Sequence, residues 1–372
     1  MLKRGKTKGQ PEFMQLALDE ARKGCGRTHP NPMVGCVIVR DGAVVAKGYH
    51  ARAGTAHAEV VALKRAGAAA RGADVYVTLE PCDHVGRTGP CTEALIKAQV
   101  KRVFVAMRDP HKIVYGRGFR TLRKAGIEVH VGLLNEECVR LNEAYVHYVR
   151  TGAPFVVAKM AQSIDGRVAT RSRESKWITS EKARKFGQRL RDQLDAILVG
   201  VETVLADDPR LTCRLRGGVD PVRVVLDSQA RTPPKCQVVQ AAKTSKKPTL
   251  IVVGKDASPT RVRGLKRAGA EVLVCELKGG RVHLPALLEE LARRGILSVL
   301  VEGGPTVIGS FFDADLVNKV HAFVAPLVIG GDDAPGSVGG LGPARLMNAS
   351  RLRGVTTEQI GDDFLITGYC AP

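Results

Sequence analysis

Strand-sized apolar runs alternate with segments of helical periodicity along the first 150 residues. This alternation is typical of a mixed α/β sheet with helices on its faces. Asp41-Gly42 separates the first two runs and predicts a tight hairpin, because such a pair accepts the positive φ angles that a two-residue turn needs. Strands are expected at 33–39, 44–49, 73–79, 102–107 and 127–134, and helices at 13–21, 57–70, 92–98, 118–126 and 135–150.

A second α/β series follows residues 150–154, whose sequence RTGAP is typical of a linker. A chain of 372 residues is longer than one ordinary domain of about 150 residues. We therefore predict two domains, 1–150 and 151–372. In the second, helices are expected at 180–192 and 285–294, and strands near 195–200, 222–227, 249–253, 270–275, 297–301, 319–325 and 363–369.

The composition excludes several classes of protein. With 44% hydrophobic and 25% charged residues, the chain is globular rather than disordered or collagen-like. No apolar run approaches the roughly 20 residues that cross a bilayer. The basic N-terminus also lacks the apolar stretch of a secretory signal. Nine scattered cysteines are an odd number and do not indicate a disulfide framework. We expect a soluble cytoplasmic protein that has no membrane partner.

The net charge of +20 is spread along the chain. The first 150 residues hold 25 Lys and Arg against 14 Asp and Glu, and the remainder holds 32 against 23. Such an excess favours anionic partners, either nucleic acid or phosphorylated small molecules. Aromatic residues make up only 4% of the chain, so stacking platforms for single-stranded nucleic acid are few. Charge alone leaves both kinds of partner open.

The strongest chemical signal is His57-Ala58-Glu59 followed by Cys82 and Cys91. One imidazole and two thiolates form a three-ligand zinc site, and a catalytic site leaves the fourth position to water. Zinc lowers the pKa of that water toward about 7, which makes hydroxide available at neutral pH. Glu59 is then placed to carry a proton from the water to a leaving amine. This is the pattern of the zinc deaminases.

Two other interpretations of this pattern stay open at this point. A glutamate in the first turn of a helix also stabilises the helix dipole, without any catalytic role. A purely structural zinc site would require a fourth protein ligand. His84 is available, but it lies only two residues beyond Cys82, where the usual ligand spacing is not met. A non-enzymatic zinc scaffold also leaves Glu59 without a function.

Eight residues separate Cys82 from Cys91, whereas cytidine and tRNA-adenosine deaminases have two between their cysteines. This loop, PCDHVGRTGPC, together with THPNPMVGCVIV (28–39) and AGTAHAEVVAL (53–63), resembles the bifunctional deaminase–reductases of riboflavin biosynthesis. The resemblance extends from about Phe13 to the C-terminus. It implies an α/β chain with two parts: an N-terminal cytidine-deaminase-like α/β/α sandwich and a C-terminal dihydrofolate-reductase-like α/β domain.

The same resemblance implies a substrate pocket in the first domain. Asn31, His50 and Arg87 would line the site of a phosphoribosylated diaminopyrimidinone. A planar guanidinium such as that of Arg87 suits a phosphate. Turn chemistry is an alternative explanation for Asn31, and a surface charge for Arg87. The chain departs from the family at Gly89, where proline is usual, and at His111, where asparagine is usual. Gly89 would loosen the loop but removes no ligand.

The second domain has no G-x-G-x-x-G motif, but SVLVEGGPTVIGSFF (298–312) indicates a strand, two glycines and a helix start. Glycines and a helix N-terminus together favour a bound phosphate, although the same pattern is also ordinary turn chemistry. The segments at 154–169, 174–180, 195–214 and 223–228 resemble the reductase half of the same family. That half is implied to use NADPH to reduce a ribosyl group to a ribityl chain.

Residue by residue, the resemblance implies two groups of contacts in the reductase. The cofactor positions are Ala161, Trp177, Thr203, Asp207, Ser228, Gly304, Pro305, Thr306, Val307, Ile308, Gly309 and Ser310. The substrate positions are Ser175, Arg191, Leu211, Arg214 and Glu302. Arg191 and Arg214 would bind the substrate phosphate. Trp177, the only tryptophan, would cover an apolar ring face or else be a core aromatic.

Reduction also needs a proton donor near the carbon that accepts hydride. Lys159 is the predicted donor and Asp165 its support, although either residue could be structural. We therefore expect a homo-oligomeric enzyme with one zinc ion per chain and NADPH, which acts on phosphoribosylated pyrimidines and not on nucleic acid. The alternative is a tRNA base deaminase with an appended domain, which the net charge favours.

Overall fold

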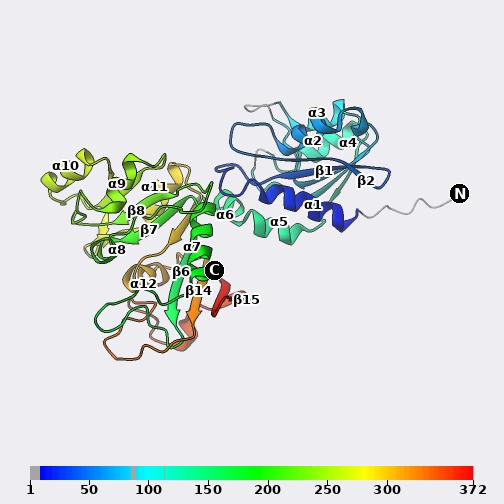
Figure 1. The fold of residues 1–372 in the computed structure, drawn as a ribbon. Helices are drawn as coiled ribbons and strands as arrows, with labels where there is room; N and C mark the ends of the chain where they lie inside the picture. Colours follow the sequence, from blue (N-terminus) through cyan, green and yellow to red (C-terminus); the bar gives the residue numbers. More distant parts are fainter. Residues whose placement is uncertain (1–8, 85–88, 113, 372) are drawn as a thin grey trace. The chain divides into compact units, whose positions relative to one another are not determined.

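The computed structural model describes residues 9–84, 89–112 and 114–371. It divides the chain into two compact units, residues 1–152 and 153–372 (Figure 1). The boundary between the units lies between Gly152 and Ala153, inside the segment 150–154 that has the composition of a linker. Each unit has its own sheet. Among the described residues, no helix has both the length and the apolar character required to cross a membrane.

The first unit contains a five-stranded mixed sheet in the order β2-β1-β3-β4-β5. Strand β1 is antiparallel to β2 and β3, whereas the β3–β4 and β4–β5 pairs are parallel. The predicted hairpin is confirmed, with φ of 50° at Asp41 and 79° at Gly42. The strands are β1 (Gly35–Arg40), β2 (Ala43–Tyr49), β3 (Asp74–Leu79), β4 (Arg102–Met107) and β5 (Glu128–Val131).

Helices cover both faces of this sheet (Figure 1). Cys36 and Ile38 of β1 pack against α2 (Ala58–Ala66), followed by η1 (Gly67–Ala70), and against α3 (Cys91–Lys97) and α4 (Arg117–Lys124). Val37 and Val39 point to the other face and pack against α1 (Pro11–Arg22), α5 (Asn135–Leu141) and α6 (Glu143–Thr151). This alternation follows from the two-residue period of a strand. The predicted α/β/α sandwich is confirmed.

Two features of the first unit differ from the sequence prediction or add to it. The helix expected at 135–150 is broken at Asn142, because its side chain accepts from the Met33 amide (2.8 Å) and donates to the Met33 carbonyl (3.0 Å). Gly48 allows close packing beneath α2, since a Cβ there would lie 2.5 Å from the Ala58 carbonyl oxygen. That contact fixes the start of α2, where His57 is the N-cap residue.

The second unit contains a nine-stranded sheet in the order β10-β9-β8-β7-β13-β6-β14-β16-β15. Neighbouring strands from β10 to β14 are parallel, and β16 is antiparallel to both β14 and β15. The strands are β6 (Phe155–Ser163), β7 (Ala196–Gly200), β8 (Val222–Leu226), β9 (Thr249–Val253), β10 (Glu271–Val274), β13 (Ser298–Val301), β14 (Lys319–Ala325), β15 (Leu352–Ile360) and β16 (Asp363–Cys370); β11 (Leu277–Lys278) and β12 (Arg281–Val282) form a separate hairpin.

Helices also cover both faces of the second sheet. On one face, α11 (Leu284–Arg293) and α12 (Pro305–Asp313) contribute Leu287, Leu291 and Phe311 to the core. On the other face, α7 (Glu181–Gln193) packs against Phe323 and Leu365. The remaining helices are α8 (Val201–Asp207), α9 (Gln237–Gln240), η2 (Ala241–Lys243), α10 (Pro259–Arg267) and η3 (Leu346–Asn348).

Buried His321 on β14 makes the stability of the second unit depend on pH. Its Nδ1 lies 2.9 Å from the Thr367 hydroxyl, and burial, with a smaller effect of Lys319, lowers its pKa from 6.5 to about 4. The unfolded chain therefore takes up a proton that the fold excludes, and stability falls as the pH drops below 6.5 toward 4. We expect His321 to account for a loss of about 2 kcal/mol between pH 7 and pH 5.

His321→Asn should remove this contribution. Denaturant unfolding at pH 7 and pH 5 gives the change in the free energy of unfolding between the two pH values. The difference between this change in the wild-type protein and in the variant is the contribution of His321. Equal changes would contradict the assignment to His321.

Candidate functional site

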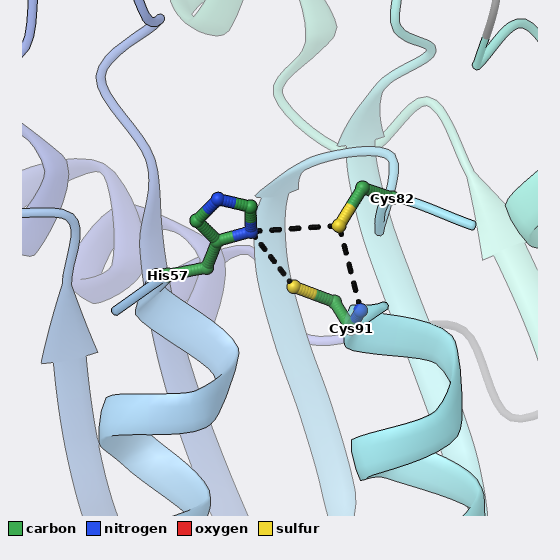
Figure 2. A group of neighbouring side chains, drawn as sticks. All are labelled: His57, Cys82 and Cys91. Carbon is green, nitrogen blue, oxygen red and sulfur yellow. Dashed lines mark hydrogen bonds between the residues drawn. The ribbon is translucent and has the colours of Figure 1, made fainter. Parts of the chain in front are cut away.

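His57, Cys82 and Cys91 converge at one edge of the first sheet (Figure 2). His57 precedes α2, Cys82 follows β3, and Cys91 begins α3. His57 Nδ1 lies 3.1 Å from the Cys91 sulfur and 3.4 Å from the Cys82 sulfur, and the three possible ligand atoms lie within 4.8 Å of one another. A nitrogen and two sulfurs at such distances suit tetrahedral zinc with one position left open.

The electrostatics of this cluster favour a metal ligand at Cys82. Hydrogen bonds from the Cys91 side chain and from His57 and the Cys91 backbone outweigh burial, and they lower the pKa of Cys82 to about 4. The Cys91 amide lies 3.4 Å from the Cys82 sulfur. A thiolate is therefore present at neutral pH, and the thiolate is the form that binds a metal. The nine cysteines all lie among the described residues, and none of them forms a disulfide.

Glu59 lies in the first turn of α2 and is 3% exposed. Burial raises its pKa to about 7, and the charge of Cys82 acts in the same direction. A carboxyl group with this pKa can both accept and release a proton near neutral pH. Among the described residues, the ligand cluster holds no fourth metal-binding side chain, and His84 is exposed outside it. The geometry therefore favours an open catalytic centre over a closed structural one.

Asp83 holds the loop that carries Cys82 against the neighbouring helices. Its two carboxylate oxygens accept hydrogen bonds from the Thr92 hydroxyl (2.7 Å) and the Thr121 hydroxyl (2.8 Å). The Thr92 amide also donates to the Cys82 carbonyl (3.2 Å). These bonds fix the two thiols relative to each other. The motif alone does not identify this support, because Thr121 is 38 residues from Asp83.

Asn31 and His50 lie beside the metal-binding cluster. The His50 ring lies 5.5 Å from the His57 ring, and Asn31 Nδ2 lies 3.1 Å from His50 Nε2. His50 Nδ1 lies 3.2 Å from the Ala56 carbonyl oxygen, so the ring donates there and accepts from Asn31. Burial lowers the pKa of His50, which is consistent with a neutral ring. Arg87 lies outside the described residues.

In the second unit, a cavity of about 1100 Å³ lies at the carboxyl ends of β6, β7, β8 and β13. Ligands of open α/β sheets bind at this edge. Lys159 lines the cavity, as do all five residues predicted to bind substrate: Ser175, Arg191, Leu211, Arg214 and Glu302. Eleven of the predicted cofactor residues line it too: Ala161, Trp177, Thr203, Asp207, Ser228, Gly304, Pro305, Thr306, Val307, Ile308 and Ser310.

Three basic side chains surround Glu302 in this cavity and form a cluster with a net positive charge. The Glu302 carboxylate accepts a 2.6 Å hydrogen bond from Arg191 Nη2, and both side chains are at least 85% buried. Burial opposes the charge of Glu302, but Arg191, Lys159 and Arg214 together lower its pKa. The buried Nε of Arg191 has no hydrogen-bond partner among the described residues. The cluster therefore retains a donor and excess positive charge for an anionic ligand.

Trp177 is 66% exposed at the cavity, so the alternative of a core aromatic is wrong. The Arg184 guanidinium stacks over its ring at 4.4 Å. Lys176 forms a 3.5 Å ion pair with Asp207 on the same cavity lining. The sequence does not predict the other basic residues of this lining, and the charge excess of the second domain is the only signal for them. They are Arg173, Lys176, Arg184, Arg210, Arg231 and Arg281.

Two predicted residues lie elsewhere. Gly309 does not line the cavity; a Cβ there would lie 2.0 Å from the Gly339 carbonyl oxygen, so this glycine serves close packing. Asp165 is exposed and also absent from the lining. Its carboxylate accepts from the amides of Ile329 (3.1 Å) and Gly330 (2.8 Å). These hydrogen bonds hold a loop, and among the described residues no hydrogen bond or ion pair joins Asp165 to Lys159.

The fold and the metal-binding cluster of the first unit define a zinc deaminase, and the second unit is a reductase of the dihydrofolate-reductase-like class. Residues 7–107 match the zinc-binding region of cytidine and deoxycytidylate deaminases, and residues 154–366 match the RibD C-terminal domain. The chain belongs to the RibD family of bifunctional riboflavin-biosynthesis enzymes, which combine a zinc-dependent deaminase with an NADPH-dependent reductase.

Individual relatives are similar over nearly their whole length. The riboflavin biosynthesis protein RibD of Actinobacillus pleuropneumoniae is 45% identical, over 97% of this chain and 95% of its own. RibD of Acinetobacter baumannii has a similar solved structure, with a TM-score of 0.87, 36% identity, and coverage of 97% of this chain and 99% of its own. The third is a diaminohydroxyphosphoribosylaminopyrimidine deaminase/5-amino-6-(5-phosphoribosylamino)uracil reductase from Thermotoga maritima, with a TM-score of 0.86, 35% identity, and coverage of 97% and 98%.

The family assignment agrees with the main interpretation of the sequence and not with the alternative, a nucleic-acid base deaminase that carries an appended domain. The predicted fold classes of both domains are likewise confirmed. Phosphoribosylated pyrimidines, the expected substrates, are consistent with this family.

Proposed function

We propose that residues 1–150 deaminate 2,5-diamino-6-(5-phosphoribosylamino)pyrimidin-4(3H)-one and that residues 151–372 reduce the product, 5-amino-6-(5-phosphoribosylamino)uracil, to its ribityl form. The observation that carries the deaminase assignment is the convergence of three zinc-ligand atoms within 4.8 Å of one another. Glu59 lies beside them, in the first turn of the helix that begins after His57. The cationic cavity around Glu302 supports the reductase assignment.

In the deaminase, His57, Cys82 and Cys91 would hold the ion. Bound zinc supplies an acidified water at the open position. Glu59 would accept a proton from this water, whose oxygen bonds to the ring carbon, and would deliver the proton to the amino nitrogen; the carbon–nitrogen bond then breaks, ammonia leaves, and the water oxygen remains as the carbonyl. Its raised pKa, near 7, suits both transfers. Asn31, whose amide is oriented by His50, would hold the pyrimidine by hydrogen bonds. Arg87 is proposed to contact the phosphate.

In the reductase, bound NADPH would supply the hydride that reduces the anomeric carbon after the ribose ring has opened to an imine. The residues of this chain would bind and protonate the substrate. Arg191 and Arg214 would bind its phosphate, because both lie beside Glu302 and carry the charge that a phosphate requires. Lys159 would donate the proton that the imine nitrogen takes up when hydride adds to the carbon. The N-terminus of α12, at Gly304 and Pro305, would hold a phosphate of the cofactor.

One assay tests this assignment of substrate. Ammonia release is measured with the phosphoribosylated diaminopyrimidinone and, separately, with a tRNA anticodon loop. NADPH oxidation is then followed on the deaminated product. We expect both activities on the pyrimidines and no ammonia from the tRNA. Activity on tRNA alone would overturn the proposal.

We also propose that the enzyme is a cytoplasmic homo-oligomer. Its nine cysteines form no disulfide among the described residues, and two of them are proposed zinc ligands, which suits a reducing compartment. Strand β15 lies at the edge of the second sheet, is exposed along residues 353–359, and carries Val355, which is 51% exposed. An exposed edge strand of this length is a template for pairing with another strand. A second copy of the chain would cover it.

Val355→Lys should therefore shift the protein toward the monomer, because a charge on an edge strand opposes pairing. Light scattering after size-exclusion chromatography measures the mass of each form. Val274→Lys is the matched control, because it makes the same substitution at an exposed valine (61%) on β10, at the opposite edge of the same sheet. A monomeric wild-type protein would contradict the oligomer, and an unchanged mass of Val355→Lys would exclude this edge as its interface.

A further inference from the structure

The segment between β14 and β15 contains no strand and only the short turn η3, yet one part of it is fixed at both ends. We define residues 327–342 as the clamp loop. At its first end, the turn after β6 makes five hydrogen bonds to it. The Ile164 amide donates to the Leu327 carbonyl (3.0 Å), and the Val168 amide donates to the Pro335 carbonyl (3.0 Å). Two side chains of the same turn make the remaining contacts.

Asp165 and Arg167 supply these side-chain contacts. Both oxygens of Asp165 accept from backbone amides of the clamp loop, at 3.1 Å from Ile329 and 2.8 Å from Gly330. Arg167 Nη1 donates to the Ala334 carbonyl at 2.6 Å. Ala334 is only 2% exposed, although the residues before it are exposed. Hydrogen bonds from Ser163 and from these two amides lower the pKa of Asp165 to about 2, so the carboxylate is charged at neutral pH.

The second end of the clamp loop is fixed to α12. Asp313, in the last turn of this helix, accepts from the amides of Leu341 (2.8 Å) and Gly342 (3.0 Å). The Gly339 amide donates to the Pro305 carbonyl (2.9 Å) in the first turn. Gly309 lies between them, and the close approach of Gly339 explains why no larger residue fits there. The clamp loop thus lies along the helix whose N-terminus faces the cavity.

Between its two fixed ends, the clamp loop lines the cavity through Pro335 and Ser337. Val168, on the turn after β6, and Pro305 and Ser310, on α12, line the same cavity. The loop therefore connects a strand end to a helix start across one wall of the cavity. If this wall is ordered before the ligand binds, the free energy of binding is not reduced by the entropy cost of ordering the loop.

We propose that the clamp loop is a preformed wall of the NADPH site and that Asp165 and Asp313 are positioning residues that set the affinity for NADPH. The inference rests on the proposed function, because it takes the cavity beside α12 as the cofactor site. Neither carboxylate lines the cavity, so both act through the backbone amides that they hold. Release of either end would leave Pro335 and Ser337 free to move away from the ligand.

Asp165→Asn and Asp313→Asn test the proposal in the full-length, zinc-loaded protein. An asparagine keeps one acceptor and replaces the other with a donor, which cannot accept from an amide. The only tryptophan, Trp177, lines the cavity, so quenching of its fluorescence reports NADPH binding. We expect the Kd for NADPH to rise about fivefold to tenfold in each variant, as the loss of one hydrogen bond predicts.

Two further readouts separate positioning from catalysis. At saturating NADPH, kcat for reduction should stay within about twofold of wild type, because no group that touches the substrate has changed. Hydrogen exchange at 329–336 should accelerate in Asp165→Asn, and at 339–342 in Asp313→Asn. Asp333→Asn is the matched control, because it changes the same charge on an exposed residue of the same loop outside the cavity lining.

Three results would overturn the proposal. An unchanged Kd in both variants would show that the clamp loop does not set affinity. An equal rise of the Kd in Asp333→Asn would show that the effect comes from the change in net charge. A fall in kcat of Asp165→Asn at unchanged Kd would return Asp165 to a catalytic role. Absence of NADPH binding in the wild-type protein would instead reject the proposed cofactor cavity itself, and the clamp with it.

Discussion

Glu59→Gln is expected to lower the rate of deamination by about 10²–10⁴-fold, the usual contribution of a general acid–base group. The glutamine side chain keeps the size of the glutamate but can neither take nor release a proton. Zinc content, measured by elemental analysis, should stay near one ion per chain, because Glu59 is not among the ligand atoms of the cluster. Ammonia release measures the loss, and NADPH oxidation on pre-deaminated substrate should continue.

Two variants make this result specific. Glu93→Gln carries the same substitution in the first turn of α3, where Glu93 is exposed, and should retain full activity. Cys82→Ser should lose both zinc and deamination while reduction continues. If Glu59→Gln turns over substrate at the wild-type rate, the acid–base role is wrong and Glu59 stabilises only the helix.

The elements of the first unit follow from local patterns. Hydrophobic alternation predicts β1 to β4, and Asp41-Gly42 predicts the hairpin, because each signal lies within a few residues. The three zinc ligands are also predictable from local sequence, because His57 directly precedes a helix and Cys82 follows a strand. The break at Asn142 is not, because it depends on Met33, which is 109 residues away.

In the second unit, local patterns predict less. Strand β15 is not among the predicted strands, because its exposed residues carry no alternating apolar face. Residues of the cavity come from four strand ends, and only the family resemblance places them together. The role of Asp165 depends on amides 164 and 165 residues away, at Ile329 and Gly330. Sequence identifies such a carboxylate but not its partners.

Arg191→Met is expected to lower the rate of reduction at least about 100-fold and to destabilise the second unit by about 3–5 kcal/mol. The stability loss arises because Glu302 would keep a buried charge without its partner at 2.6 Å. The activity loss arises because a charged donor for phosphate is gone, and kcat/KM should fall about 100-fold or more. Denaturant unfolding and NADPH oxidation measure the two effects separately, and ammonia release serves as the internal control.

The double variant Arg191→Met/Glu302→Gln separates the structural role of this pair from its binding role. The second substitution removes the buried charge, so most of the lost stability should return, whereas reduction should stay low because a methionine side chain binds no phosphate. If activity returns together with stability, Arg191 only neutralises Glu302 and the phosphate lies elsewhere in the cavity. If stability does not return, the cost of Arg191→Met comes from lost packing and from the Thr212 carbonyl, which accepts from Arg191 Nη1 at 3.3 Å.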